Sequence, residues 1–201
     1  MYYTGIMLAE DDNPLRDLNE AVLWLGKAGD TGNADSYEQI GYIFETKLND
    51  LHTAFKWYEC AAQNGSKAGQ FQAGRFLFNG PIVGDGSFEI VDYDAAFKYY
   101  WAAAHSGHLD AMTDLAKCYE EGKGTEKNLD AAIKWYVRAA ELGEFFAQAD
   151  LAVLLFKYGN IDGAYYWENK AYNDFPERRN LIEDAYKIIT EEYNKKHGYG
   201  E

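Results

Sequence analysis

The sequence predicts an all-α fold: a right-handed alpha-alpha superhelix, or solenoid, of antiparallel helical hairpins with a C-terminal capping helix. Three observations support this prediction. Small, apolar and aromatic residues recur at the three- and four-residue spacing of one helix face. The same set of residues returns along the chain at intervals that are typical of repeat proteins. Only 3 of the 201 residues are proline, so little interrupts helix formation.

The stretch from Ala111 to Gly143 is the clearest copy of the repeat. In its front half, Leu115 and Tyr119 share one face of a predicted helix with Ala111. In its back half, the apolar stripe comprises Ala131, Ala132, Trp135, Tyr136, Ala139 and Ala140. Two helices of this kind in succession predict an antiparallel hairpin.

Glycine and short polar residues mark the ends of these two helices. Gly122 and Gly124 end the first helix and form the turn. Asn128 or Asp130 can then accept hydrogen bonds from the free amides at the start of the second helix. Gly143 ends the second helix, because glycine adopts the left-handed conformation that often follows a last turn.

The repeat can be followed through the chain from one aromatic residue in each second helix. These residues are Trp24, Trp57, Tyr99, Trp135 and Trp167, at spacings of 33, 42, 36 and 32 residues. Eight positions after the first four of them stand Gly32, Gly65, Gly107 and Gly143. A coincidence at four places is improbable, so we interpret the chain as about four and a half hairpins followed by a terminal helix.

We therefore expect residues 1–201 to form a single solenoid domain. Its predicted parts are a truncated first repeat (1–32), a repeat (33–65), a repeat with an inserted loop at 80–94 (66–107), a repeat (108–143), a degenerate repeat (144–174) and a C-terminal capping helix (175–201). The inserted loop is a candidate contact element, because insertions in repeat proteins collect on loops.

Composition and charge restrict the possible functions. The formal net charge of −14 argues against nucleic-acid binding, which needs lysine and arginine on phosphates, and favours a basic partner. The sequence has no stretch of about 18 apolar residues, so it predicts no membrane span. The N-terminus has no signal-peptide pattern, so we expect a cytoplasmic protein unless a leader preceded this sequence. Cys60 and Cys118 are interpreted as reduced core thiols.

An alternative function class rests on two polar features. The long turn carries Asp85, Glu89, Asp92 and Asp94, whose oxygens could hold a hard cation, although their spacing does not match an EF-hand. His105 and His108 flank Gly107 and could share a metal only if that turn brings them together. A hydrolase or a small-ligand or metal-binding protein therefore stays open. No catalytic motif is present, and we expect no enzyme activity, no cofactor and no metal.

The residues of the repeat resemble the Sel1-like repeat family, which is related to the tetratricopeptide solenoids. The resemblance is carried by the stretch AFKWYECAAQNG at 54–65 and by Ala111, Leu115, Ala116, Tyr119, Gly122, Gly124, Asp130, Ala132, Trp135, Tyr136, Ala139, Ala140 and Gly143. It implies a scaffold for protein-protein contacts. Some family members join the two helices of one repeat by a disulfide, but Cys60 and Cys118 belong to different, non-adjacent units.

We expect the first helices of the hairpins to line the concave binding side. Side chains that the core stripe leaves free are the candidate partner-binding residues: Glu38, Tyr42, Glu45, Phe71, Arg75, Phe78, Asp114, Lys117 and Phe156. The aromatic members are typical anchors of protein interfaces. We expect the double substitution Phe71→Ala with Phe78→Ala to abolish binding and leave the melting temperature nearly unchanged.

The function predicted from these features is a non-enzymatic interaction scaffold or adaptor. Its acidic, aromatic-studded groove would hold a protein or peptide partner, with a basic partner favoured. A neutralising, immunity-like partner of a bacterial toxin or effector is one form of this role. The acidic charge would accelerate capture of a basic partner, and salt should slow it.

Overall fold

A computed structural model of the chain describes residues 1–13, 15–80 and 91–199. Within them the chain is all helical and contains no strand. The prediction of an all-α fold built from helical hairpins is therefore confirmed. The described chain has no helix with both the length and the apolar character needed to cross a lipid bilayer.

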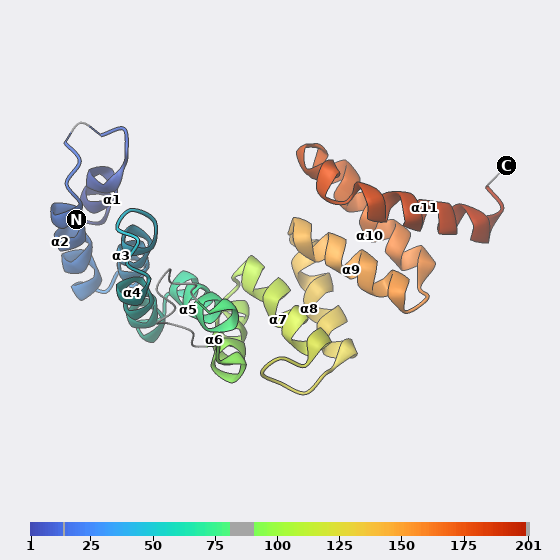
Figure 1. Ribbon diagram of the computed structural model, residues 1–201, viewed down its shortest axis with the longest axis horizontal. Coiled ribbons are helices and arrows are strands. Elements are labelled where there is room, and N and C mark those ends of the chain that lie inside the picture. The colour runs from blue at the N-terminus through green and yellow to red at the C-terminus, as the bar shows by residue number, and fades with distance from the viewer. Residues whose placement is uncertain (14, 81–90, 200–201) are drawn as a thin grey trace. The chain divides into compact units, whose positions relative to one another are not determined.

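The helices alternate between first and second members of successive hairpins (Figure 1). The first helices are α1 (Tyr2–Ala9), α3 (Asp35–Thr46), α5 (Lys67–Asn79), α7 (Leu109–Glu121) and α9 (Phe145–Lys157). The second helices are α2 (Leu18–Asp30), α4 (Leu51–Gln63), α6 (Tyr93–His105), α8 (Leu129–Glu141) and α10 (Ile161–Asp174). A short 3-10 helix, η1 (Pro176–Leu181), and a last helix, α11 (Glu183–His197), follow.

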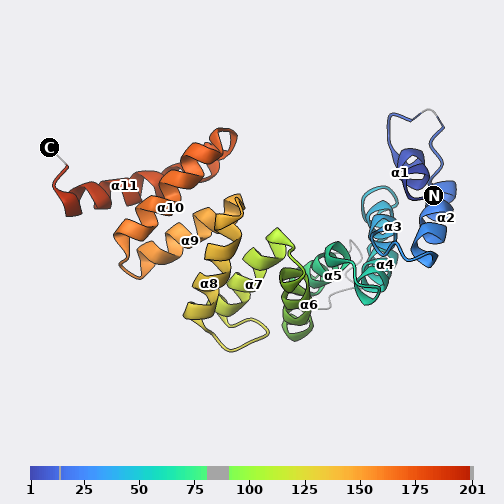
Figure 2. The ribbon, with the colours of Figure 1, turned by 180° about the vertical axis from the view of Figure 1, so that it is seen from behind.

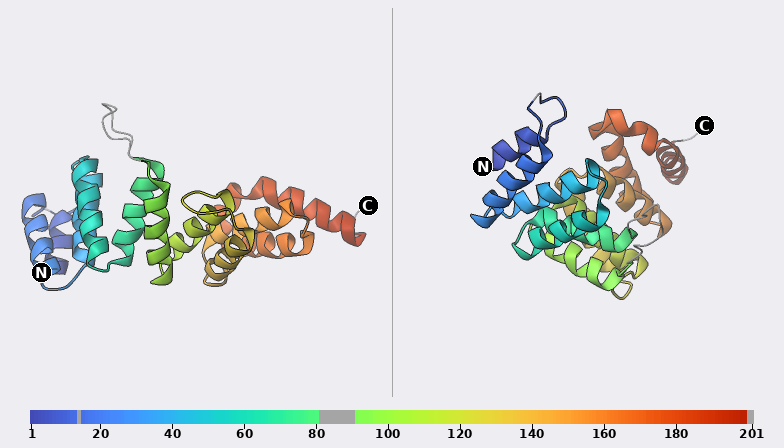
Figure 3. Two further views of the ribbon diagram at one scale, coloured as in Figure 1. Left: turned by 90° about the horizontal axis from the view of Figure 1, so that it is seen from below. Right: turned by 60° about the vertical axis from the view of Figure 1, so that its left-hand side comes forward.

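The chain divides into two compact units. Unit 1 comprises residues 1–111 and 123–126, and unit 2 comprises residues 112–122 and 127–201. Within unit 1, α1 packs on α2, α3 on α4 and α5 on α6, and Figure 3 shows the partners of these pairs running side by side. In unit 2, α9 packs on α10, and α8 also contacts α9.

Every second helix begins with an aspartate or asparagine cap. In α8, the Asn128 side chain accepts a hydrogen bond of 3.0 Å from the Ala131 amide, as the repeat pattern predicts. The same arrangement recurs in the other four second helices, where the capping residues are Asp17, Asp50, Asp92 and Asn160. Such caps satisfy amides that the helix leaves free, so the sequence sets the start of each second helix.

A glycine eight residues after each of the first four aromatic anchors follows the end of the second helix. Gly32, Gly65, Gly107 and Gly143 have φ angles of +100°, +88°, +83° and +87°. Residues with a Cβ adopt this left-handed region at a cost, so glycine is favoured there. The glycines place the next first helix at the same point in each repeat.

The residue immediately after the aromatic anchor is buried in every hairpin. The five anchors are all half-buried, as expected for equivalent positions. The residues that follow them are almost fully buried: Leu25, Tyr58, Tyr100, Tyr136 and Glu168. Three of them face glycines of the first helices, since Gly5 lies opposite Leu25, Gly41 opposite Tyr58 and Gly74 opposite Tyr100. A Cβ placed on Gly41 would lie 2.7 Å from the Tyr58 ring. Small residues therefore let the two helices of a hairpin approach closely.

The last helix packs on the end of unit 2, as predicted for a capping helix (Figure 2). Tyr165 stacks on Tyr193 and Tyr172 on Tyr186, with ring centroids 3.9 Å and 4.0 Å apart. Ile189 is buried in a cluster with Ala152 and Ala164. These contacts remove apolar surface of α9 and α10 from water.

Candidate functional site

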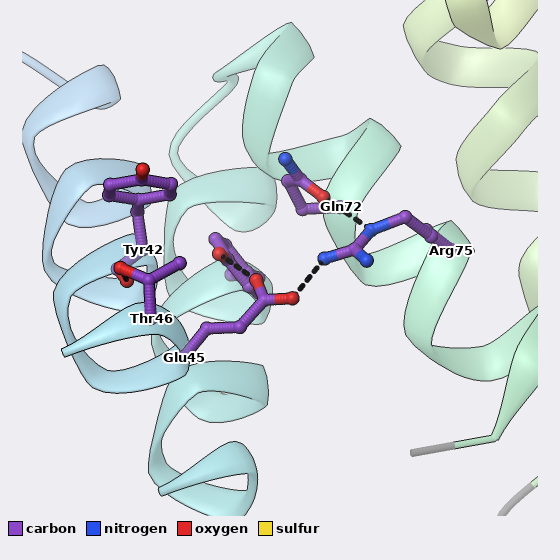
Figure 4. A network of polar contacts seen from close by, with 6 residues as sticks. Tyr42, Glu45, Thr46, Gln72 and Arg75 are labelled. Carbon is purple, nitrogen blue, oxygen red and sulfur yellow. Dashed lines mark hydrogen bonds and ion pairs between the residues drawn. The ribbon is translucent and has the colours of Figure 1, made fainter. Parts of the chain in front are cut away.

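The first helices of unit 1 present a polar surface whose centre is an ion pair between two repeats. Arg75 on α5 donates a hydrogen bond of 2.6 Å from Nη2 to Oε1 of Glu45 on α3 (Figure 4). The other oxygen of Glu45 accepts a hydrogen bond of 2.6 Å from the buried Tyr58 hydroxyl. Gln72 accepts a further bond of 2.7 Å from Nε of Arg75. We call Gln39, Tyr42, Glu45, Gln72 and Arg75 the first-helix surface of unit 1.

Burial shifts the protonation of two groups at this network. The pKa of Tyr58 is raised because the ring is desolvated and its hydroxyl donates to Glu45. Burial also raises the pKa of Glu38, which is only 8% exposed, and the nearby Asp35 and Glu45 add to this, although a hydrogen bond from Gln39 opposes it. Glu38 therefore offers a partner little surface, although the sequence placed it among the candidate binding residues.

Tyr42 is the predicted residue that the structure leaves most open. It lies one helical turn before Glu45 and Thr46 on α3, and 46% of its surface is exposed. It borders a pocket of about 510 Å³ between α1, the residues that follow α1, and α3. The pocket is lined by Ile6, Ala9, Glu10, Asp11, Asp12, Gln39, Tyr42, Ile43 and Lys47.

Phe71 and Phe78 are half-buried between elements of unit 1. The Phe71 ring stacks on His108, with centroids 4.4 Å apart, and also contacts Tyr100. The Phe78 ring contacts Tyr93 and Tyr100, at centroid distances of 5.1 Å and 5.9 Å. Both rings therefore have packing roles inside the unit, and only part of each can meet a partner.

Unit 2 has its own first-helix surface, formed by Asp114, Lys117, Phe146, Asp150 and Val153. Lys117 on α7 and Asp150 on α9 form an ion pair of 3.0 Å between neighbouring repeats. Burial lowers the pKa of Lys117, but Asp150, Asp114 and Glu144 outweigh this, so the net pKa is raised and the ammonium stays charged. Phe146 and Val153 lie on α9, and each is 49% exposed.

The last predicted residue, Phe156, has a different environment. Its ring is half-buried and packs against the cluster formed by Ala152, Ala164 and Ile189. Seven of the nine predicted residues thus fall into three groups, while Glu38 is buried and Asp114 is half-buried. Glu45, Arg75 and Lys117 form ion pairs that connect repeats, Phe71, Phe78 and Phe156 pack within a unit, and Tyr42 is open.

The polar residues on which the alternative function rests do not form a metal-binding arrangement in the described part of the chain. The His105 ring stacks on Trp101, and its Nδ1 lies 2.8 Å from the Trp101 carbonyl oxygen. Nδ1 of His108 accepts a hydrogen bond of 3.3 Å from the Ala111 amide. No three His, Cys, Asp or Glu side chains gather as metal ligands in the part of the chain that the structure describes.

Of the four acidic residues of the long turn, the structure describes Asp92 and Asp94. Asp92 caps α6 through a hydrogen bond from the Ala95 amide, and Asp94 lies in the first turn of that helix. Asp85 and Glu89 lie outside the described residues. Cys60 is half-buried and Cys118 is buried, and the two form no disulfide.

The pocket residues on α1 and directly after it were not among the candidate residues predicted from the sequence. Ile6 and Ala9 lie on α1, and Glu10, Asp11 and Asp12 follow it. The repeat pattern describes a single hairpin and not the space between two hairpins, so it gave no indication of a pocket there. The available signal was the run of three carboxylates directly after the apolar helix.

Comparisons with known proteins agree with the repeat assignment. The model of the Sel1 repeat matches residues 1–33, 39–66, 67–108 and 109–144. A solved Sel1 repeat protein from Oxalobacter formigenes is similar, with a TM-score of 0.69 and 27% identity over 86% of this chain and 71% of that one. No curated protein matches the chain.

Two more distant structures share the fold. Cysteine rich protein B of Helicobacter pylori gives a TM-score of 0.51 at 24% identity, over 69% of this chain and 97% of that one. An immunity protein of Pseudomonas aeruginosa gives a TM-score of 0.52 at 20% identity, over 86% of this chain and 63% of that one. Likeness at this level concerns the fold alone.

Proposed function

Because this chain belongs to the Sel1 repeat family, whose members generally act as scaffolds for protein-protein interaction, we propose that it binds a protein or peptide partner along its first helices. The family is typically non-catalytic, and the role proposed here is binding without chemistry. The proposed contact regions are the first-helix surfaces of units 1 and 2.

One observation carries this proposal. Ion pairs hold neighbouring first helices together, and apolar side chains beside these pairs are exposed. Glu45 and Arg75 connect α3 with α5, and Lys117 and Asp150 connect α7 with α9. Tyr42 stands beside the first pair, and Phe146 and Val153 flank Asp150 along α9. Rigid helices that display exposed apolar side chains among charges lose little entropy when they bind.

Charge indicates which partners are favoured. With a net charge of −14, the chain repels other acidic proteins and attracts basic ones over distances of about a Debye length. We therefore propose a basic protein or peptide, and a neutralising role toward a basic toxin or effector is one form of this function. Raising the salt concentration from about 0.05 to 0.3 M should slow association several-fold, whereas a neutral interface would show no such dependence.

Site-specific photocrosslinking in the native cell tests the proposal. A benzophenone amino acid would be placed at Tyr42 or at Phe146, and at Trp101 as a control. Trp101 is 47% exposed, which matches the other two positions, but it lies on the second helix α6. We expect one protein to be captured from positions 42 and 146 and not from 101. Equal capture from all three positions would contradict a first-helix binding surface.

A further inference from the structure

Between α3 and α5, the protein fills the junction of two first helices with its own ion pair. Gly41 and Gly74 occupy equivalent places, since each faces the buried tyrosine of its own hairpin. Counted from these glycines, Glu45 is four residues after the first and Arg75 one residue after the second. Their side chains meet at 2.6 Å.

Between α1 and α3, the same two positions hold residues that cannot form such a pair. Gly5 takes the equivalent place in α1, because it faces Leu25 of its hairpin. Four residues later stands Ala9 instead of a glutamate, and one residue after Gly41 stands Tyr42 instead of an arginine. A methyl group and an exposed ring take the places of the carboxylate and the guanidinium, and the pocket of about 510 Å³ lies between them.

The carboxylates of the pocket exceed the cations that neutralise them. Asp11 forms ion pairs with Lys47 and, at 3.2 Å, with Arg16. The hydrogen bond from Lys47 is the main reason that the pKa of Asp11 lies below its usual range. Glu10 and Asp12 have no ion pair among the described residues, and both are exposed at the rim. The pocket therefore keeps two carboxylates that an incoming cation can neutralise.

The backbone adds negative potential of its own. The pocket lies at the C-terminal ends of both α1 and α3, where Ala9 and Glu10 end one helix and Ile43 and Lys47 lie in or just after the last turn of the other. The C-terminal end of a helix carries a partial negative charge, which favours cations. Two helix ends and the free carboxylates thus act in the same direction.

We propose that this pocket binds the side chain of one arginine or lysine of the partner, at the place where Arg75 lies in the next junction. The aliphatic stem would lie against Ile6, Tyr42 and Ile43, and the cationic head would face Glu10 and Asp12. A guanidinium on the face of Tyr42 gains further attraction from the aromatic ring. The inference rests on the proposed function, since it names the side chain by which a partner is held.

The test uses blocked tripeptides and the full-length, 15N-labelled chain. The probe is acetyl-Gly-Arg-Gly-amide, with a lysine version as a second probe. The control is the citrulline version, which has nearly the same shape as arginine but no charge. We expect the arginine peptide to give saturable shifts at residues 9–12, 42, 43 and 47, at least tenfold tighter than citrulline. Equal affinities for the two peptides would overturn the proposal.

Two variants locate the binding. Glu10→Gln with Asp12→Asn should weaken arginine binding at least tenfold, whereas Glu141→Gln with Glu191→Gln removes the same charge from exposed positions outside the pocket and should weaken it less than twofold. Equal losses would show that net charge, and not the pocket, attracts the peptide. Ala9→Glu with Tyr42→Arg should build an internal pair like Glu45 with Arg75, and so abolish binding while the helical content stays unchanged. A variant filled in this way that still binds arginine would overturn the proposal.

The results separate this inference from the proposed function. If the arginine peptide binds at the pocket but no protein is captured from positions 42 and 146, the scaffold proposal fails and the pocket stands. If a partner is captured from both positions but the arginine peptide gives no shifts at the pocket, the scaffold proposal stands and the pocket inference fails.

Discussion

The buried Tyr58 hydroxyl donates a hydrogen bond of 2.6 Å to Glu45, the carboxylate that also receives Arg75 of the next repeat. One side chain thereby connects the two helices of a hairpin with the neighbouring hairpin. A similar bond, of 3.1 Å, joins Tyr136 to Glu120 in unit 2. Since each of these tyrosines follows an aromatic anchor, the contact is a recurrent feature of the repeat.

We predict that Tyr58→Phe destabilises the chain by about 1–2 kcal/mol, because it removes a buried hydrogen bond to a charged acceptor. Urea denaturation followed by circular dichroism measures the change. Tyr136→Phe provides a matched comparison in unit 2, where the bond is longer, and should cost less. An unchanged midpoint for Tyr58→Phe would show that the bond contributes nothing net to stability.

Glu168 should make the stability depend on pH. It takes the place of the buried tyrosine in the last hairpin, is 1% exposed, and neither of its oxygens has a hydrogen-bond partner in the described structure. Burial raises its pKa to about 7. The unfolded chain ionises this group near pH 4.5, so its contribution is most favourable below that pH and is lost as the pH rises to about 7.

Measurements of Glu168→Gln across pH check this prediction. The free energy of unfolding of the unmodified chain, relative to the variant, should fall by up to about 3 kcal/mol between pH 4 and pH 8. Glu141→Gln, at an exposed position of α8, is the control and should leave the pH profile unchanged. A constant difference between the unmodified chain and Glu168→Gln over this range would mean that the carboxyl is ordinary in the folded state.

Two glycine substitutions in helices should have opposite signs. A Cβ on Gly69 would lie 2.4 Å from the Ala61 Cβ and 2.9 Å from the Ala62 nitrogen, and backbone yields little, so Gly69→Ala should cost about 2 kcal/mol or more. No atom lies within 4 Å of a Cβ on Gly26, so Gly26→Ala should stabilise α2 by up to about 1 kcal/mol. Thermal melting distinguishes the two, and equal effects would contradict the close approach of Gly69 on α5 to Ala61 and Ala62 on α4.

Phe71 and Phe78 test whether the half-buried rings are structural or binding residues. Because both contact Tyr100, we expect Phe71→Ala with Phe78→Ala to lower the melting temperature by several degrees, in contrast to the expectation from sequence. Tyr42→Ala removes a more exposed ring and should affect melting less. An unchanged melting temperature in the double variant would instead favour the sequence-based expectation of free binding rings.

The fold could be predicted from the sequence because the repeat uses local signals. Caps such as Asn128, glycines such as Gly143 and the apolar stripes act within one hairpin, so a single chain reveals them. The substitution of Glu168 for a tyrosine was also visible in the alignment of the anchors. Its burial follows from its position directly after Trp167, where the repeat places a buried side chain.

The candidate site could be predicted only in part, because helical periodicity places a residue on a face without giving its partner on another helix. Glu45 and Arg75 were assigned to the free face, yet they pair with each other across 30 residues of sequence. Phe156 was assigned to the same face and packs against Ile189 of the last helix. The pocket depends on the small size of Ala9 opposite Tyr42, a relation between two repeats that no single helical pattern contains.

The contacts between neighbouring helices also determine how the chain should respond to mechanical load. The main contacts of the described helices join elements one or two places apart in the chain, such as α3 with α4 and α4 with α5. None of these main contacts between described helices joins segments far apart in the chain, so a pulling force on the ends would be resisted by one hairpin junction at a time. Extension should therefore proceed in discrete steps, each releasing roughly 35 residues, or about 120 Å of contour length.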